Sequence, residues 1–238
     1  VATEQPRFVE QAIRSVESLR RWMPEVHVAL FTDIPESRDD LRLLFDAVYE
    51  LPVAEGVGTS WGSGLLGKVR AFSRSPYQAS VYLDSDTRIL KPRVKELFGA
   101  LEACEIALAA CEPGESRNQR NSGRPMFNTG VVAFRRTPKV QGLLAAWLEL
   151  QEAHARAIRE RRMNTFEYVR HLQGVDKLYQ LVADQTALAR YLAPEGDAFG
   201  VRCHTLERIW NWRRDDIDPA LADEVVIHHA ERFKVDPL

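Results

Sequence analysis

The sequence is poor in cysteine, has almost no net charge and contains no long apolar run. Its three cysteines, Cys104, Cys111 and Cys203, lack the spacing of a metal site, and a chain of this length does not need disulfide bonds for stability. We therefore expect reduced thiols that pack in the core of a cytoplasmic protein. The formal charge of -2 argues against a global field that would recruit nucleic acid or an anionic membrane surface. No stretch approaches the roughly 20 apolar residues that a bilayer-spanning helix needs, so we expect no membrane span.

The chain does have enough apolar residues for one large core. Its 238 residues are 45% apolar, which is typical of a single domain of this length. Strand-like and helix-like patterns alternate along it, so the sequence predicts an α/β fold with a layered sheet flanked by helices. Strands are expected at 1–3, 26–31, 47–53, 81–83, 106–110, 131–134 and 225–229, and helices at 9–19, 35–45, 68–75, 92–101, 138–163 and 178–192.

The most informative stretch is SVYLDSDTRIL at residues 80–90. An apolar strand ends there in two carboxylates, Asp84 and Asp86, and the following Lys91-Pro92 prevents a regular continuation. Ligands of open α/β sheets bind at such strand ends, and two crowded carboxylates repel each other unless something positive lies between them. A divalent cation is the simplest such partner. The alternative is that Asp84 caps the turn and Asp86 is solvated.

A glycine-rich segment at residues 55–67 raises the question of a nucleotide-binding loop. Gly62, Gly64 and Gly67 form a G-x-G-x-x-G pattern, and Lys68 follows. A P-loop requires Ser or Thr after the lysine, and the chain has Val69 there. No strand leads directly into the segment, so we expect a mobile loop over a site. Lys68 then begins a short helix, on which it is either a ligand-binding residue or part of a solvated face.

Three other places carry polar residues in apolar surroundings. Asn128 precedes the expected strand at 131–134, where its amide serves either a ligand or turn chemistry. Asp184 and Gln185 lie among apolar residues of the expected helix at 178–192, and such groups need protein partners or a ligand when buried. The apolar run at 225–227 leads to His228, and Lys234 follows six residues later.

Together these segments resemble a GT-A type glycosyltransferase, above all the retaining family that includes glycogenin and bacterial lipopolysaccharide galactosyltransferases. The matching segments are Ala2-Thr3 with the family's first strand end, 82–87 with Y-L-D-x-D-T, 128–131 with N-x-G-V, Asp184-Gln185 with its Asp-Gln pair, and 228–234 with its terminal His-x-x-Gly-x-x-Lys. The chain departs from the last motif at Glu231, which replaces the glycine, and at Val235, where the family commonly has proline.

The resemblance implies a single GT-A domain over residues 1–238, with a mixed, mostly parallel sheet flanked by helices. Its nucleotide-binding half would cover about 1–110 and its donor-sugar and acceptor half about 111–238. The implied metal ligands are Asp84, Asp86 and His228, for Mn²⁺ or Mg²⁺. The implied nucleotide-binding residues are Ala2, Thr3, Lys68, Ser85 and Lys234. Asn128 and Asp184 would bind the donor sugar, and Gln185 and Asp184 would be catalytic.

The implied reaction is metal-dependent transfer of a sugar from a nucleotide diphospho-sugar, with a UDP-sugar as the expected donor and retention of anomeric configuration. The acceptor, whether a sugar, glycan, lipid or small molecule, is not identified, because variable loops such as 112–125 contact it. Two alternatives remain. A haloacid-dehalogenase-type phosphatase would use Asp84 and Asp86, although Arg88 stands where its motif has Thr or Val. A non-catalytic nucleotide-sugar-binding module would keep the pocket without turnover.

Overall fold

The structure is a computed structural model that describes residues 2, 6–33, 41–51, 60–111, 126–163, 165–173, 184–192, 199–213, 217 and 219–229. The side chains of residues 60–65, 165, 166, 169, 184 and 186 also lie outside the description. The described elements are α1 (Pro6–Arg20), β1 (Ala29–Thr32), α2 (Leu41–Leu44), β2 (Ala47–Glu50), α3 (Ser60–Arg74), β3 (Ala79–Leu83), β4 (Thr87–Ile89), the 3-10 helix η1 (Pro92–Lys95), α4 (Glu96–Ala100), β5 (Ile106–Ala110), β6 (Phe127–Arg135), α6 (Pro138–Glu160), α7 (Thr165–His171), α9 (Asp184–Leu192), β7 (Cys203–Leu206), the 3-10 helix η2 (Arg208–Trp210) and β8 (Ile227–His229).

The strands form one larger sheet and two short pairs. The larger sheet has the order β3-β6-β5-β7, with antiparallel β3–β6 and β5–β6 pairs and a parallel β5–β7 pair. β1 and β2 pair in parallel, and β4 and β8 pair antiparallel. The α/β fold with a mixed sheet and flanking helices, expected from the sequence, is confirmed.

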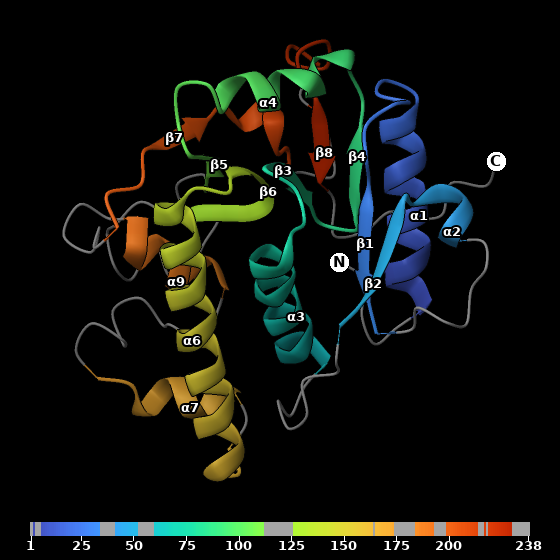
Figure 1. The fold of residues 1–238 in the computed structure, drawn as a ribbon. Coiled ribbons are helices and arrows are strands. Elements are labelled where there is room, and N and C mark those ends of the chain that lie inside the picture. Colours follow the sequence, from blue (N-terminus) through green and yellow to red (C-terminus); the bar gives the residue numbers. More distant parts are fainter. Residues whose placement is uncertain are drawn as a thin grey trace.

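Both faces of the larger sheet are covered, which explains why β6 is buried along most of its length. Because side chains alternate along a strand, Val132 and Phe134 join the core formed with α3, α6 and α9. Val131 and Ala133 join the opposite core, formed with α4, η2 and β8. In Figure 1, α3 and α6 lie side by side below the sheet, and α4 lies above it. The sheet thus forms the central layer of the molecule.

Two buried serines of α1 fix the strand β4 that follows the acidic turn. The Ser18 hydroxyl accepts a hydrogen bond from the Ile89 backbone N–H at 2.9 Å. The Ser15 and Thr87 hydroxyls lie 2.9 Å apart. α1 and β4 are side by side in Figure 1. These contacts place the start of β4, and with it the acidic turn, against a rigid helix.

The glycine-rich segment differs from its prediction. α3 begins at Ser60, so Gly62, Gly64 and Gly67 lie within a helix and not in a loop. A glycine in a helix costs up to about 1 kcal/mol relative to alanine, but α3 packs against α6 and its Val69 and Phe72 belong to the core. Tertiary packing therefore outweighs the local preference, and the strand-to-helix turn of a P-loop or dinucleotide-binding motif is not present at these glycines.

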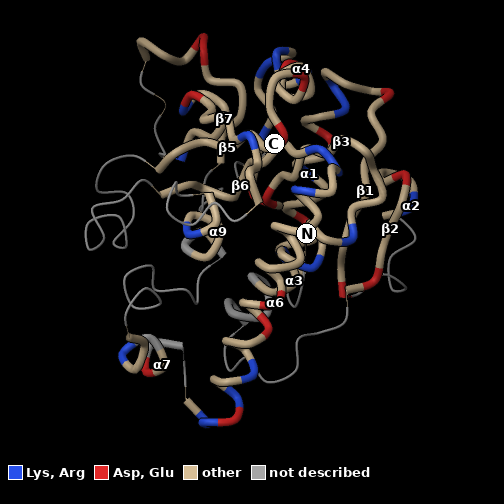
Figure 2. Tube along the Cα trace, turned by 60° about the vertical axis from the view of Figure 1, so that its left-hand side comes forward, with Lys and Arg blue, Asp and Glu red and all other residues tan. Residues whose placement is uncertain are grey.

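Two smaller expectations are also corrected. Cys104 and Cys111 are buried, as expected, but Cys203 is exposed on β7. Asn128 and Gly130 lie inside β6, whereas the sequence placed them before the strand. The expected loop at 112–125 lies outside the described residues. Basic and acidic positions are interspersed along the described trace (Figure 2), in agreement with the nearly balanced charge of the sequence.

Candidate metal centre

The acidic turn connects β3 to β4 and is held by backbone and hydroxyl groups. The Asp84 N–H donates to the Gly130 carbonyl of β6 at 2.8 Å. The Asp84 carbonyl accepts from the Thr87 backbone N–H at 3.2 Å and from the Thr87 hydroxyl at 2.8 Å. Thr87 is fully buried. The turn thus fixes the direction of Asp84 and Asp86 without using either carboxylate.

The Asp84 carboxylate has a lysine and a tyrosine as partners. Lys68 Nζ lies 3.0 Å from Asp84 Oδ1, and the Tyr82 hydroxyl donates to the same oxygen at 2.7 Å. Burial alone would raise the pKa of Asp84, but the Lys68 ammonium, the neighbouring His229 and the hydrogen bond from Tyr82 outweigh it and lower that pKa to about 2. Asp84 is therefore an ionised, ligand-ready carboxylate at neutral pH.

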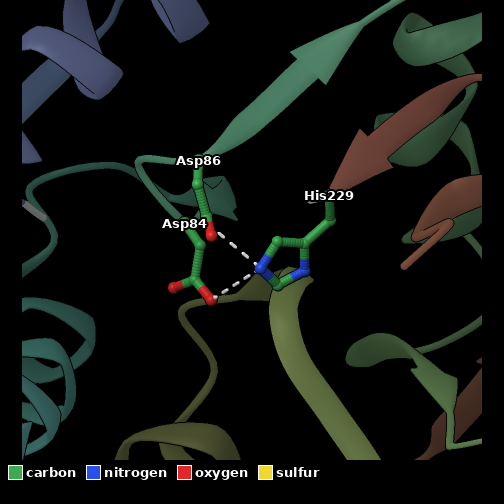
Figure 3. Close-up of side chains that lie close together, drawn as sticks. All are labelled: Asp84, Asp86 and His229. Atoms are coloured by element: carbon green, nitrogen blue, oxygen red, sulfur yellow. Dashed lines mark ion pairs between the residues drawn. The ribbon is translucent and has the colours of Figure 1, made fainter. Parts of the chain in front are cut away.

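His229 brings a nitrogen to the two carboxylates. Its Nε2 lies 3.2 Å from Asp86 Oδ1 and 3.5 Å from Asp84 Oδ2, and one ligand atom from each residue lies within 4.8 Å of the others. Figure 3 shows the imidazole of β8 pointing between the carboxylates. Adjacent ligands of an octahedral Mg²⁺ at about 2.1 Å are roughly 3.0 Å apart. The three side chains therefore fit a small divalent cation after slight adjustment.

The structure brings His229, and not the predicted His228, to the aspartates. In the β4–β8 pair, Thr87 lies opposite His229 and Arg88 opposite His228. Consecutive side chains of a strand point to opposite faces, so a shift of one residue decides which histidine meets the acidic turn. His228 is paired with Arg88 and is not among the three residues that converge here. This is a correction to the predicted ligand set, because the sequence alone did not define the register of β8.

The imidazole of His229 is seated by two residues from other elements. Its Nδ1 lies 2.9 Å from Oδ1 of Asn211, the C-cap residue that follows η2. A Cβ on Gly130 would lie 2.2 Å from His229 Cε1 and 2.3 Å from Nδ1, closer than any real contact. The N-x-G segment of β6 therefore has a glycine because the histidine ring occupies that space. Sequence reasoning missed Asn211, whose only signal is a polar residue between two tryptophans.

Asn128 is buried next to this cluster, and its hydrogen bonds among the described residues go to protein groups: local turn chemistry, which is one of the two roles that the sequence left open, and a second asparagine. Its Oδ1 accepts from the Gly130 N–H at 2.8 Å, which is local turn-like chemistry, and from Asn211 Nδ2 at 2.7 Å. Its Nδ2 has no hydrogen-bond partner among the described residues, although the residue is only 2% exposed. An unsatisfied buried donor is costly, so this nitrogen is expected to have an acceptor other than the described residues.

The other predicted site residues are partly described. The Ala2 N–H donates to the Phe31 carbonyl at 3.0 Å and extends the β1 edge. Ser85 lines, together with Asp84, a cavity of about 260 Å³ between α1, β1 and β3. Gln185 is half-buried in the first turn of α9, which packs on β6. The Asp184 side chain, Thr3 and Lys234 lie outside the described residues.

The chain was compared with known proteins by sequence and by structure. No family model matches it, and no related sequence is found among curated proteins. Solved structures do match. Mouse xyloside xylosyltransferase 1 in its apo form is similar over 99% of this chain and 97% of its own, with a TM-score of 0.55 and 15% identity. The fold is that of glycosyltransferases.

Two further similar structures are of one galactosyltransferase. LgtC, in complex with donor and acceptor sugar analogs, is similar over 98% of this chain and 86% of its own, with a TM-score of 0.59 and 10% identity. An LgtC variant whose active-site glutamine is changed to glutamate matches with a TM-score of 0.54 and 11% identity, over 97% of this chain and 86% of its own. The GT-A fold implied by the sequence resemblance is thereby confirmed.

No described helix combines the length and the apolar character needed to cross a membrane.

Proposed function

We propose that this chain is a metal-dependent glycosyltransferase that moves a sugar from a nucleotide diphospho-sugar, with a UDP-sugar as the expected donor, to an acceptor. The observation that carries the proposal is the convergence of Asp84, Asp86 and His229 at a strand end of a fold shared with glycosyltransferases. Two carboxylate oxygens and one imidazole nitrogen suit Mn²⁺ or Mg²⁺ better than Ca²⁺, which prefers oxygen ligands alone.

The residues of the cluster would hold the cation against the donor diphosphate. A bound divalent ion supplies positive charge to a leaving diphosphate whose negative charge grows in the transition state. Asp84 and Asp86 are partly exposed, at 25% and 19% of their side-chain surface, so the side facing solvent is open to phosphate oxygens. Lys68, whose ammonium lies 3.0 Å from Asp84, is a second positive group for that diphosphate.

Asn128 is the residue best supported as a contact of the donor sugar. Its buried Nδ2 has no partner among the described residues and could donate to a sugar hydroxyl. The remaining nucleotide contacts, Ala2, Thr3, Ser85 and Lys234, are proposals from the family resemblance. The cavity beside Ser85 supports a nucleoside position next to β1.

Gln185 and Asp184 are proposed as the catalytic pair, near the donor sugar. The support is that α9 packs on the strand that carries Asn128, and that LgtC has a glutamine in its active site. An amide is a poor nucleophile, so we propose front-face displacement. The bond from the anomeric carbon to the diphosphate breaks, the acceptor oxygen bonds to the same face, and its proton passes to the leaving diphosphate. The anomeric configuration is then retained.

The two alternatives stand differently. A haloacid-dehalogenase-type phosphatase has no support from the fold, which resembles glycosyltransferases over nearly the whole chain. A non-catalytic binding module has the same fold and would differ only in turnover. Release of nucleoside diphosphate therefore distinguishes it from the enzyme.

The test is a turnover screen with UDP-, GDP- and ADP-sugars and Mn²⁺, in which release of the nucleoside diphosphate is measured. We expect one donor to be hydrolysed slowly, chelation to stop the reaction, and Asp86→Asn to abolish it. The exposed Glu102 provides a matched control, since Glu102→Gln should leave the rate unchanged. Metal-independent release, or binding of donor without any release, would contradict the proposal. Proton NMR of the transferred linkage then reports retention, and an inverted product would exclude the front-face mechanism.

A further inference from the structure

Asn211 connects the candidate metal ligand His229 to the central sheet through a short chain of side-chain hydrogen bonds. Its Oδ1 lies 2.9 Å from His229 Nδ1, and its Nδ2 donates to Asn128 Oδ1 at 2.7 Å. Asn128 Oδ1 also accepts from the Gly130 backbone N–H at 2.8 Å. The side chains of Asn128, Asn211 and His229 are almost completely buried, so water does not compete for these hydrogen bonds.

One backbone group, the Gly130 N–H, determines which atom donates in each hydrogen bond of this series. A backbone N–H can only donate, so the atom of Asn128 next to Gly130 must be the carbonyl oxygen. The Asn211 atom next to that oxygen must then be the amide nitrogen, which turns the Asn211 oxygen toward His229. An oxygen there can only accept, so Nδ1 of His229 carries a hydrogen. The other ring nitrogen, Nε2, is the one that faces Asp84 and Asp86.

We propose that Asn211 is a positioning residue that holds His229 in the Nδ1–H tautomer, so that the lone pair of Nε2 points into the space between Asp84 and Asp86. The inference rests on the proposed function, because it assigns Asn211 a role in the cation site. A neutral imidazole with its lone pair facing two carboxylates is unfavourable alone and favourable around a cation. Partners of the second ring nitrogen commonly set the tautomer and orientation of metal-binding histidines.

The backbone around Asn211 is anchored independently of its side chain. The Trp212 N–H donates to the Ile227 carbonyl at 2.9 Å, and the His229 N–H donates to the Trp212 carbonyl at 2.7 Å. The Val226 N–H donates to the Ile209 carbonyl at 2.9 Å. Removal of the Asn211 amide therefore leaves the segment attached to β8. A change in metal binding can then be separated from a loss of fold.

The experiment measures Mn²⁺ affinity of the whole chain by electron paramagnetic resonance for the wild type, Asn211→Ala and Asn211→Asp. We expect Asn211→Ala to raise the Kd for Mn²⁺ by about 10- to 100-fold, the usual effect of removing such a partner. Asn211→Asp keeps an acceptor for Nδ1–H and should recover most of the affinity. Glu105→Gln, which alters a buried residue whose carboxylate accepts from Thr137 and Arg202 away from the cluster, should leave the Kd unchanged.

A second readout reports the tautomer directly. In ¹H–¹⁵N spectra of histidine-labelled, Mg²⁺-saturated protein, wild-type His229 should show a protonated Nδ1 and a deprotonated Nε2. Asn211→Ala should lose that pattern while its remaining spectrum stays dispersed. Unchanged Mn²⁺ affinity and an unchanged tautomer in Asn211→Ala would overturn the role of Asn211 but not the cation site. Failure of the wild type to bind Mn²⁺ would instead overturn the cation site, and the inference with it.

Discussion

At the scale of single residues, the candidate site depends on a glycine, which has no side chain, as much as on its ligands. Gly130 leaves the space that the His229 ring occupies, and its carbonyl accepts from the Asp84 N–H. One residue of β6 thus fixes the acidic turn with its backbone and admits the histidine by having no Cβ. This gives a physical reason for the N-x-G pattern that the sequence showed only as a resemblance.

Substitution of Gly130 tests this account. Gly130→Ala should displace the His229 ring, because the new Cβ would lie 2.2 Å from Cε1, and should weaken Mn²⁺ binding by roughly the 10-fold or more seen when a ligand is misplaced. Calorimetry measures the binding. Gly99→Ala is the matched control, since a Cβ there meets nothing within 4 Å. Equal Mn²⁺ affinity in the two variants would contradict the proposed role of Gly130.

At the scale of elements, a buried glutamate connects the starts of β5, α6 and β7. Glu105 precedes β5. It accepts from the Thr137 hydroxyl, which also caps α6, at 2.9 Å and from the Arg202 N–H just before β7 at 3.1 Å. The bond from Arg202 lowers the pKa of Glu105 below 4.5, burial opposes this, and Thr137 lowers it further. The ionised form is therefore favoured in the folded state.

The pH dependence of stability follows from this shift. Because the pKa of Glu105 is lower in the folded chain, its contribution is complete above about pH 4.5 and is lost as the pH falls through the folded-state pKa. Glu105→Gln should reduce the free energy of unfolding at neutral pH by about 1 to 3 kcal/mol. The difference from wild type should shrink as the pH is lowered from neutral through the folded-state pKa. Urea unfolding over this pH range measures it, with Glu102→Gln as an exposed control. A difference that does not vary with pH would show that the charge of Glu105 is irrelevant.

The sequence predicted elements well where local pattern and tertiary packing agree. The strand at 106–110 has the predicted bounds, and the helix that begins at Pro138 is marked by its proline and its Thr137 cap. Asp84 and Asp86 were predicted because an apolar run ends in them. The helical start of α3 was not, since its glycines favour a loop locally and the gain comes from packing against α6.

The histidine that meets the acidic turn and its partner Asn211 could not be derived from local pattern. His228 and His229 are adjacent, and only the pairing of β8 with β4 decides which one faces the acidic turn. Asn211 meets His229 because η2 and β8 are neighbours, although the two residues are 18 positions apart. Such contacts depend on how β8 pairs with its neighbours, and the sequence pattern of one strand does not specify that pairing.

At the scale of the whole molecule, the fold is shared with glycosyltransferases at only 10–15% identity. The cores on both faces of the sheet can change in sequence while the strand ends keep their places, because packing tolerates volume-conserving substitution. A divalent cation would be bound by Asp84 and Asp86, in the turn before β4, and by His229 of β8. It would there bind the diphosphate of a nucleotide diphospho-sugar.

The most direct test of this central claim is Mn²⁺ binding measured by calorimetry with and without UDP, for the wild type and Asp86→Asn. The account predicts that the wild type binds a single Mn²⁺ and that UDP tightens this binding, because the diphosphate supplies further ligands. Asp86→Asn, which replaces a carboxylate ligand by an amide of the same size, should bind Mn²⁺ at least about tenfold more weakly with or without UDP. Equal Mn²⁺ affinity in the two proteins, or no binding by the wild type in the presence of UDP, would contradict it.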